Sequence, residues 1–343
     1  MRADLLRRRG LRVGAVLAIV AAVLVLAGRK VDLATLDSLS LAWRWIGASI
    51  ALNAVSALLK VGVWSSVLRS MPTSPALPFR DLCRSLFIGL CLNTVVPGRV
   101  GEAARVATVT RRHPDAPVPV LVGSVVGEHL LSSVALIATT LVLLAGVDRT
   151  VAGRFETTLL GLLAVVGALA ICVIAITLVL RTEVSRRHLR FLHVRPGGAV
   201  RLVREVAGGL RDGVAIFRSG RRGSSAIGFL MAIASAATQV ASIYTALSAV
   251  GIQPTLGRAG AAFIASSLVG IFPLVPGNVG AFQAVVAASL VTFNVDFGLG
   301  FGFAIALQAL EAAVGVGIGG WFLFREGLSI ATYRDVPARV HEQ

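Results

Sequence analysis

Six apolar stretches, each long enough to cross a lipid bilayer, constrain the fold more than any other feature of this sequence. A membrane-spanning helix needs about 20 mostly apolar residues. Such stretches occur at 12–28, 44–68, 118–146, 157–180, 224–250 and 298–324. Two further apolar stretches, 82–110 and 259–296, are each interrupted near the middle. The sequence therefore predicts an all-α integral membrane protein with six transmembrane helices and two broken-helix segments.

The composition supports membrane insertion and argues against several other classes. Hydrophobic residues make up 56% of the 343-residue chain and charged residues 15%, whereas soluble domains carry about one quarter charged residues. The net charge of +16 does not indicate a nucleic-acid binder, because the cations lie in short segments between apolar stretches instead of on one face or arm. The three cysteines lack disulfide or metal-ligand spacing, and neither lysine lies in a phosphate-binding loop. We therefore expect no nucleic-acid partner, no cofactor and no ATP hydrolysis.

The distribution of Lys and Arg predicts the orientation in the membrane. If each interrupted stretch enters and leaves by the same side, 26 of the 33 cations lie in segments that face the cytoplasm and 5 lie in outer segments. Cytoplasmic loops carry an excess of Lys and Arg, so both termini are predicted to be cytoplasmic. The interrupted stretches are then either re-entrant hairpins or pairs of short spans. The charges within 82–110 favour hairpins, because a charged span that faces lipid is costly.

Two segments each have two interpretations. The stretch 12–28 follows an Arg-rich start and could be the core of a signal peptide, but we interpret it as a retained anchor because further spans follow. Within 181–222, apolar residues recur at helical spacing with arginines between them. This pattern predicts an amphipathic helix on an anionic cytoplasmic leaflet. A solvated basic linker is the alternative.

The two interruptions share one motif. Val96-Pro97-Gly98-Arg99-Val100-Gly101 matches Val275-Pro276-Gly277-Asn278-Val279-Gly280 at an offset of 179 residues. The same offset superimposes the spans at 224–250 and 298–324 on the second and third spans. We therefore predict a single membrane domain with an inverted repeat, whose units are 44–146 and 222–325. In transporters with inverted repeats, paired Gly/Pro-interrupted segments mark a binding site near the bilayer midplane.

Proline and glycine explain why this motif interrupts a helix. Pro97 and Pro276 lack an N–H and end a helix, and the glycines of each motif allow positive φ. Backbone groups left unpaired at membrane depth are tolerated only where protein or water satisfies them. The half-helix after Pro97 would point its positive end into the bilayer, where Arg99 suits an anionic group such as a lipid phosphate. A purely structural kink is the alternative.

Charged side chains within the first broken segment are candidates for this site. Arg99, Glu102 and Arg105 are spaced i, i+3, i+6 and so share one helical face. They form either a self-satisfied ion-pair ladder or the polar wall of a cavity that contacts a lipid headgroup.

Two carboxylates lie in the helices that follow the broken segments. Glu128 is in the third span and Glu311 in the sixth. Each could pair with Arg99 or Arg105, couple to protons, contact a cationic headgroup, or form a structural interhelical bond. Lys60 in the second span is expected to snorkel to the inner interface, and Asn93 is expected to bind freed backbone groups.

These motifs resemble the lysylphosphatidylglycerol synthase transmembrane family, the flippase-like membrane region of the multiple peptide resistance factor. The pattern of its first motif is met at Asn93, Pro97, Gly98, Arg99, Gly101, Glu102 and Arg105. A later Glu-Arg pair is met at Glu128, with His129 in place of the Arg. The second motif is met at Pro276, Gly277 and Gly280, with Gln283 in place of the Glu. The resemblance covers about residues 12–325.

The resemblance implies a bacterial plasma-membrane protein that moves a phospholipid or glycolipid between leaflets and is not an enzyme. It implies that the broken segments line the cavity. With the polar residues identified above, we expect substrate binding by the residues of the two motifs and by Glu128, Asn278, Gln283 and Glu311. Because the chain continues only 18 residues beyond Arg325, no aminoacyl-transferring domain is expected. A small-solute or ion transporter and a membrane-embedded lipid-modifying enzyme are the alternatives. The lipid, the direction, the driving force and the oligomeric state, a homo-oligomer included, stay open.

Overall fold

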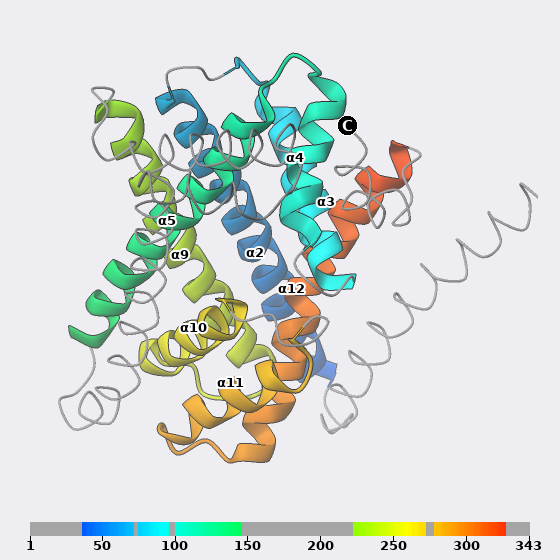
Figure 1. Cartoon of the computed structure of the whole chain (residues 1–343). Helices are drawn as coiled ribbons and strands as arrows, with labels where there is room; N and C mark the ends of the chain where they lie inside the picture. Colours follow the sequence, from blue (N-terminus) through cyan, green and yellow to red (C-terminus); the bar gives the residue numbers. More distant parts are fainter. Residues whose placement is uncertain (1–35, 72–74, 96–99, 146–221, 272–277, 327–343) are drawn as a thin grey trace, which may run out of the picture.

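The computed structural model describes residues 36–71, 75–95, 100–145, 222–271 and 278–326, and this part of the chain is all-helical (Figure 1). Its helices, in order, are α2 (Leu36–Ser70), α3 (Phe79–Val95), α4 (Val100–Arg112), α5 (Val118–Ala145), α9 (Arg222–Ala249), α10 (Leu256–Ile271), α11 (Ala281–Val291) and α12 (Phe297–Arg325). The all-α prediction is therefore confirmed.

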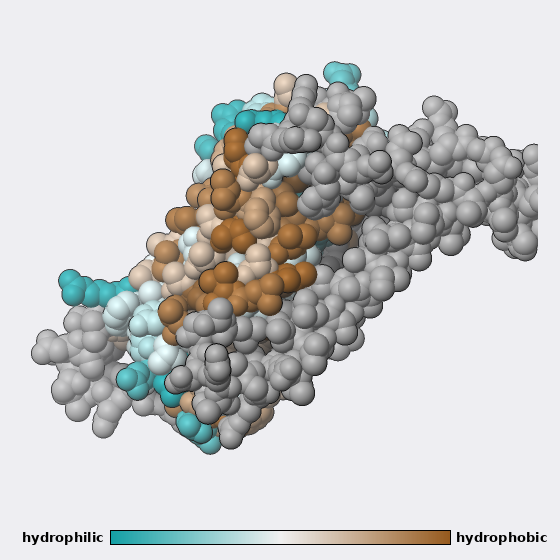
Figure 2. Space-filling model, turned by 90° about the vertical axis from the view of Figure 1, so that its left-hand side faces the viewer, coloured by the Kyte–Doolittle hydropathy of each residue, from teal (hydrophilic) through white to brown (hydrophobic). Residues whose placement is uncertain are grey.

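Four of these helices are long and apolar enough to cross a membrane, and they coincide with four of the six predicted spans. They cover Ala42–Ser70, Val118–Leu143, Ser224–Ala249 and Phe297–Arg325. Hydrophobic residues form a band across the described part of the molecule, with hydrophilic residues at both ends (Figure 2). The predicted spans 12–28 and 157–180 lie outside the described residues, as does the amphipathic segment up to residue 221. The chain is a multi-pass membrane protein.

Each interrupted apolar stretch consists of two short helices that pack against each other. In the first, the Ser85 hydroxyl on α3 donates to the Arg105 carbonyl on α4 at 2.6 Å. In the second, Arg258 on α10 donates from Nη2 to the Phe293 carbonyl just beyond α11, at 3.1 Å. The α3–α4 pair and the α10–α11 pair lie at opposite ends of the molecule (Figure 1). The segments 96–99 and 272–277, which hold Pro97, Gly98, Arg99, Pro276 and Gly277, lie outside the described residues.

Helices α2 and α9 form the centre of the molecule and are joined by pairs of serines. The Ser56 hydroxyl donates to the Ser235 carbonyl at 3.0 Å, and the Ser235 hydroxyl donates to the Ser56 carbonyl at 3.1 Å. Ser49 and Ser242 make the same reciprocal bonds at 3.0 and 2.9 Å. Small side chains and hydroxyls favour close helix packing in membranes, where no hydrophobic force holds one apolar helix to another. Helices α2 and α9 are therefore in close contact and are linked by side-chain hydrogen bonds.

The bounds of the helices repeat along the chain. Ser56 and Ser235, which bond reciprocally, are 179 residues apart. That same interval separates the first residues of α5 and α12, the last residues of α4 and α11, and the last residues of α2 and α9. A buried apolar cluster joins α2 to α5, and another joins α9 to α12. Both halves therefore have the same order of a long helix, a pair of short helices and a second long helix.

Charged residues join α3, α4 and α12 at one end of the bundle. Asp81 at the start of α3 is buried and accepts bonds from Arg84 at 3.3 Å and from Arg112 at 3.5 Å. His113 Nε2 lies 3.1 Å from the second oxygen of Asp81. Arg112 also donates to Glu326, which follows α12, at 2.8 Å. This network fixes the end of the first short-helix pair to the last long helix.

Candidate functional site

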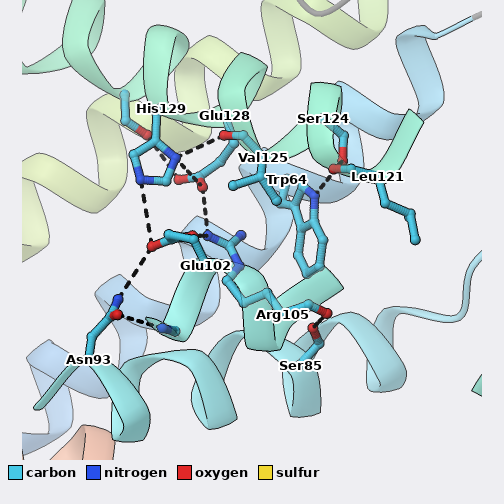
Figure 3. Close-up of polar contacts among 12 residues, drawn as sticks. Trp64, Ser85, Asn93, Glu102, Arg105, Leu121, Ser124, Val125, Glu128 and His129 are labelled. Carbon is cyan, nitrogen blue, oxygen red and sulfur yellow. Dashed lines mark hydrogen bonds and ion pairs between the residues drawn. The ribbon is translucent and has the colours of Figure 1, made fainter. Parts of the chain in front are cut away.

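The densest polar cluster of the described residues lies where α4 meets α5, and its centre is Arg105. One guanidinium nitrogen, Nη1, donates to Glu102 Oε2 and to Glu128 Oε2, both at 3.0 Å (Figure 3). Only 6% of the Arg105 side chain and 7% of the Glu128 side chain are exposed, against 29% for Glu102. The two carboxylates therefore balance a deeply buried cation, one from its own helix and one from α5.

Pairing of Glu128 with Arg105 is one of the roles that the sequence analysis predicted for Glu128. Their position follows from the i, i+3 spacing of Glu102 and Arg105 on α4, which puts both side chains on the face that packs against α5. Taking such a pair out of water is costly unless the geometry is good, and removing one member leaves an uncompensated buried charge. The predicted ion pair between Glu102 and Arg105 is therefore present, and a second ion pair joins Arg105 to Glu128 on α5.

Trp64 on α2 covers the guanidinium from one side. The guanidinium carbon of Arg105 lies 4.4 Å from the centroid of the Trp64 ring (Figure 3). The indole is fully buried and donates from Nε1 to the Ser124 hydroxyl on α5 at 2.8 Å. A cation over an indole face is attracted by the ring quadrupole, so this contact positions Arg105 as well as shielding it.

The hydrogen-bonding capacity of Arg105 is not used up. Within the described part of the chain, its Nε and Nη2 atoms are buried and have no hydrogen-bond partner. A buried donor left without an acceptor costs about 1–3 kcal/mol, and more when it is charged. The stacked indole cannot replace these in-plane acceptors. The site therefore has buried N–H donors without acceptors beside a fixed positive charge.

His129 and Asn93 form the more exposed side of the cluster. His129 is 44% exposed; its Nδ1 donates to the Val125 carbonyl at 2.8 Å, and its Nε2 lies 3.8 Å from Glu102 Oε1. Asn93 on α3 donates to the same Glu102 oxygen at 3.4 Å (Figure 3). These residues form a partly exposed polar rim above the buried Arg105–Glu128 pair.

Asn93 and Gly101 hold the first broken segment together across its interruption. The Gly101 N–H donates to Asn93 Oδ1 at 2.8 Å, which satisfies one of the free amides at the start of α4. A Cβ at position 101 would collide with the Gly89 carbonyl and the Asn93 side chain. Glycine is therefore needed here for close helix approach. The structure also supports the expectation that Asn93 binds freed backbone.

The second broken segment carries amides where the first carries charges. Asn278 has a φ of 52° and donates to the Val269 carbonyl at 2.9 Å, while Gly280 has a φ of 90°. The Gly280 N–H donates to Gln283 Oε1 at 2.6 Å, and Gln283 also donates to Gln308 on α12. Gly280 is required for its backbone conformation and not for close packing, unlike Gly101. This region is uncharged and is separate from the Arg105 cluster.

Glu311 on α12 occupies a third position. It is partly exposed and accepts a hydrogen bond from Gln239 on α9 at 2.9 Å. Lys60 on α2 is one helical turn from Trp64, which bonds to Ser124 on α5, and one turn from Ala57, which shares a buried cluster with Val314 on α12. The sequence analysis predicted that Lys60 snorkels to the inner interface. Its proximity to both carboxylates depends on how three helices pack, so it could not be predicted from residue spacing along one helix.

The predicted site residues thus fall into three groups in the described structure. Asn93, Gly101, Glu102, Arg105 and Glu128 come together, Asn278, Gly280 and Gln283 lie at the other short-helix pair, and Glu311 lies beside Gln239. Sequence reasoning missed Trp64, Ser124 and Gln239. Trp64 lies one helical turn from Lys60, and a large aromatic that near an intramembrane cation was the available signal.

The comparison with protein families settles the relationship of this chain. A sequence model described as the lysylphosphatidylglycerol synthase TM region matches residues 13–319. The chain belongs to this family. The match to the lysylphosphatidylglycerol synthase TM region covers both short-helix pairs and most of α12. No curated protein and no solved structure gave a significant match.

Proposed function

We propose that this protein binds the headgroup of a phospholipid or glycolipid within the bilayer and moves the lipid between leaflets, without chemical conversion. The observation that carries the proposal is Arg105, a buried cation whose Nε and Nη2 lack acceptors among the described residues. A phosphate offers several oxygens in the geometry that a guanidinium fork binds best. The lipid-related description of the family supports the same class of ligand.

The carboxylates around Arg105 suit reversible binding. Glu102 and Glu128 hold the guanidinium, and Glu102 lies on the exposed side, where it can release one bond as a phosphate arrives. A site with a full complement of fixed positive charge would hold an anionic headgroup too tightly to release it. We assign headgroup binding to this cluster and to Pro97, Gly98 and Arg99 of the same motif.

We further propose that the two halves form an inverted repeat, with six transmembrane helices and two re-entrant hairpins. The shared interval of 179 residues between Ser56 and Ser235 supports this, because residues that bond reciprocally with their own repeat equivalents lie on a two-fold axis. The two short-helix pairs lie at opposite ends of the molecule, which also supports an inverted repeat (Figure 1). The second motif, from Pro276 and Gly277 to Gln283, would then shape the path on the other side.

The orientation proposed from the charges puts both termini in the cytoplasm of a bacterial cell. In that orientation the Arg105 cluster belongs to the inner side, and the amide-lined second motif belongs to the outer side. Recognition of headgroup charge is therefore stronger from the inner leaflet. Membrane lipids are the proposed partners.

Reconstitution into vesicles tests the function. Vesicles with purified wild-type protein would be compared with empty vesicles, with acyl-labelled phospholipids and glycolipids followed by a membrane-impermeant quencher. Labelled lipids in the inner leaflet are protected from the quencher until they move to the outer leaflet. For at least one lipid, we expect this protection to be lost faster in vesicles with the protein than in empty vesicles. Rates equal to those of empty vesicles across the whole panel would exclude translocation. Uptake of a soluble phosphate or sugar without lipid movement would favour the solute transporter.

A further inference from the structure

Lys60 is an intramembrane cation that the proposed Arg105 site does not explain. It lies in the span Ala42–Ser70 and is exposed at the protein surface. A lysine at the centre of a transmembrane helix costs about 2.5–3.5 kcal/mol on insertion scales, so its retention calls for a partner. No hydrogen bond and no ion pair within 4.0 Å reaches its ammonium from the part of the chain that the structure describes.

Snorkelling to the nearer interface does not account for Lys60. The residue precedes the end of α2 at Ser70 by ten positions, which corresponds to about 15 Å of helix. The hydrocarbon core is about 30 Å thick. In addition, each Cα–Cβ bond of a helix tilts toward the N-terminus, which is away from the end at Ser70. The ammonium is therefore expected to stay at membrane depth.

The helix contacts bring Lys60 close to two carboxylates. Trp64 on α2 bonds to Ser124 on α5 at 2.8 Å. Lys60 and Glu128 are each one helical turn from that contact. Ala57 on α2 and Val314 on α12 belong to one buried cluster, and Lys60 and Glu311 are each one helical turn from these two residues. The packing of α2 against α5 and α12 therefore brings Lys60 near both carboxylates.

The two carboxylates differ in how well they are already paired. Glu128 is held by Arg105 at 3.0 Å. Glu311 accepts one bond, from Gln239 to its Oε1 at 2.9 Å, and across the described helices its Oε2 has no donor. Lys60 and Glu311 are thus opposite charges on helices that pack together, and the described structure contains no ion pair between them. Both are at least partly exposed.

We propose that Lys60, Glu311 and Gln239 form a second headgroup site that takes a zwitterionic group, with the phosphate on Lys60 and a primary amine on Glu311. Lysine binds phosphate as a point charge, and a carboxylate oxygen accepts from an ammonium. Gln239 fixes the carboxylate through one oxygen and leaves the other for the ligand. The inference rests on the proposed lipid translocation and adds a preference for phosphoethanolamine-type headgroups among its substrates.

The location of this site suits a second binding position along the lipid's path. Lys60 comes from α2 in the first half, while Gln239 and Glu311 come from α9 and α12 in the second. Since Lys60 and Glu128 are each one helical turn from the Trp64–Ser124 contact, a phosphate that leaves Arg105 has a second cation nearby on α2. A headgroup that also carries an amine gains the contact with Glu311, and one with a neutral glycerol does not.

The test compares two acyl-labelled lipids in the same proteoliposomes, phosphatidylethanolamine and phosphatidylglycerol. Glu311→Gln is expected to slow phosphatidylethanolamine by about tenfold, the equivalent of about 1.4 kcal/mol, and to leave phosphatidylglycerol within about twofold. Lys60→Gln is expected to slow both lipids, because both carry a phosphate. Arg44→Gln, which removes an exposed cation elsewhere on α2, is expected to change neither rate.

Specific outcomes would overturn this inference. If Glu311→Gln slows both lipids equally or neither, the amine contact is wrong, although translocation itself stands. Unchanged rates in Lys60→Gln exclude the phosphate contact independently of whether the Glu311 variant folds. Wild-type rates equal to those of empty vesicles remove the proposed function and this site together. Uptake of free phosphoethanolamine in place of lipid movement would assign the site to a soluble ligand and overturn the lipid assignment.

Discussion

At the scale of single residues, Arg105 combines a balanced charge with incomplete hydrogen bonding. Glu102 and Glu128 each take a bond from the same nitrogen, Nη1, and Trp64 lies against the guanidinium. Two further nitrogens are left without acceptors in the described structure. A purely structural ion pair would gain stability by using those donors, so their availability favours a ligand.

The two carboxylates of this cluster should differ in their contribution to stability. Glu128→Gln leaves the buried Arg105 with a single, partly exposed counter-charge, and we expect a loss of about 3–5 kcal/mol in the free energy of unfolding. Glu102→Gln removes a carboxylate that is 29% exposed, and we expect a loss of about 1 kcal/mol. Thermal unfolding in detergent would measure both. A larger loss for Glu102→Gln would contradict the assignment of buried and exposed partners.

Gly101 should be intolerant of the smallest side chain. A methyl group at this position meets the Gly89 carbonyl and the Asn93 side chain, so Gly101→Ala is expected to cost about 1–3 kcal/mol through overpacking. Gly317→Ala on α12 is a matched control because nothing lies within 4 Å of its added Cβ. In detergent, the melting temperature should fall for the first variant and stay equal or rise for the second. Equal behaviour would show that α3 and α4 are not in close contact at Gly101.

At the scale of helices, the apolar lengths in the sequence were sufficient to predict α2, α5, α9 and α12 to within several residues. The Pro-Gly motifs likewise predicted where each remaining stretch divides into two helices. The network of Asp81, Arg112 and Glu326 was not predictable, because its members come from three separate helices. The position of Lys60 relative to Glu128 and Glu311 was not predictable for the same reason: it depends on how α2 packs against α5 and α12, which the periodicity of α2 does not indicate.

The contact between α2 and α9 should depend on small side chains. Ser56→Leu inserts a bulky group where the Ser56 and Ser235 hydroxyls lie 3.0 Å apart, and we expect a loss of about 1–3 kcal/mol from overpacking. Ser56→Ala should cost only about 0.6 kcal/mol, the average for an interhelical hydrogen bond in a membrane. Ala237→Leu adds the same bulk at an exposed position of α9 and should be neutral. Similar unfolding temperatures for Ser56→Leu and Ala237→Leu would contradict the close contact.

At the scale of the whole molecule, the account requires that the two short-helix pairs begin at opposite membrane faces. The loop before α5 is then cytoplasmic and the loop between α9 and α10 is outside. Single cysteines at the exposed positions Asp115 and Gln253, in a background without the three native cysteines, would report this. A membrane-impermeant maleimide should label Gln253→Cys in intact cells and Asp115→Cys only after permeabilisation. Labelling of both from the same side would exclude the inverted repeat.

The central claim is that a buried guanidinium on α4 binds the headgroup of a translocated lipid. The most direct measurement is the initial rate of phospholipid translocation in proteoliposomes for Arg105→Gln, normalised to the amount of folded protein. Arg111→Gln, which removes an exposed arginine from the same helix, is the control. Since a hydrogen bond to a charged group is worth about 1.5–3 kcal/mol, we predict a fall of about tenfold or more for Arg105→Gln and an unchanged rate for Arg111→Gln. Wild-type rates in folded Arg105→Gln would contradict the account.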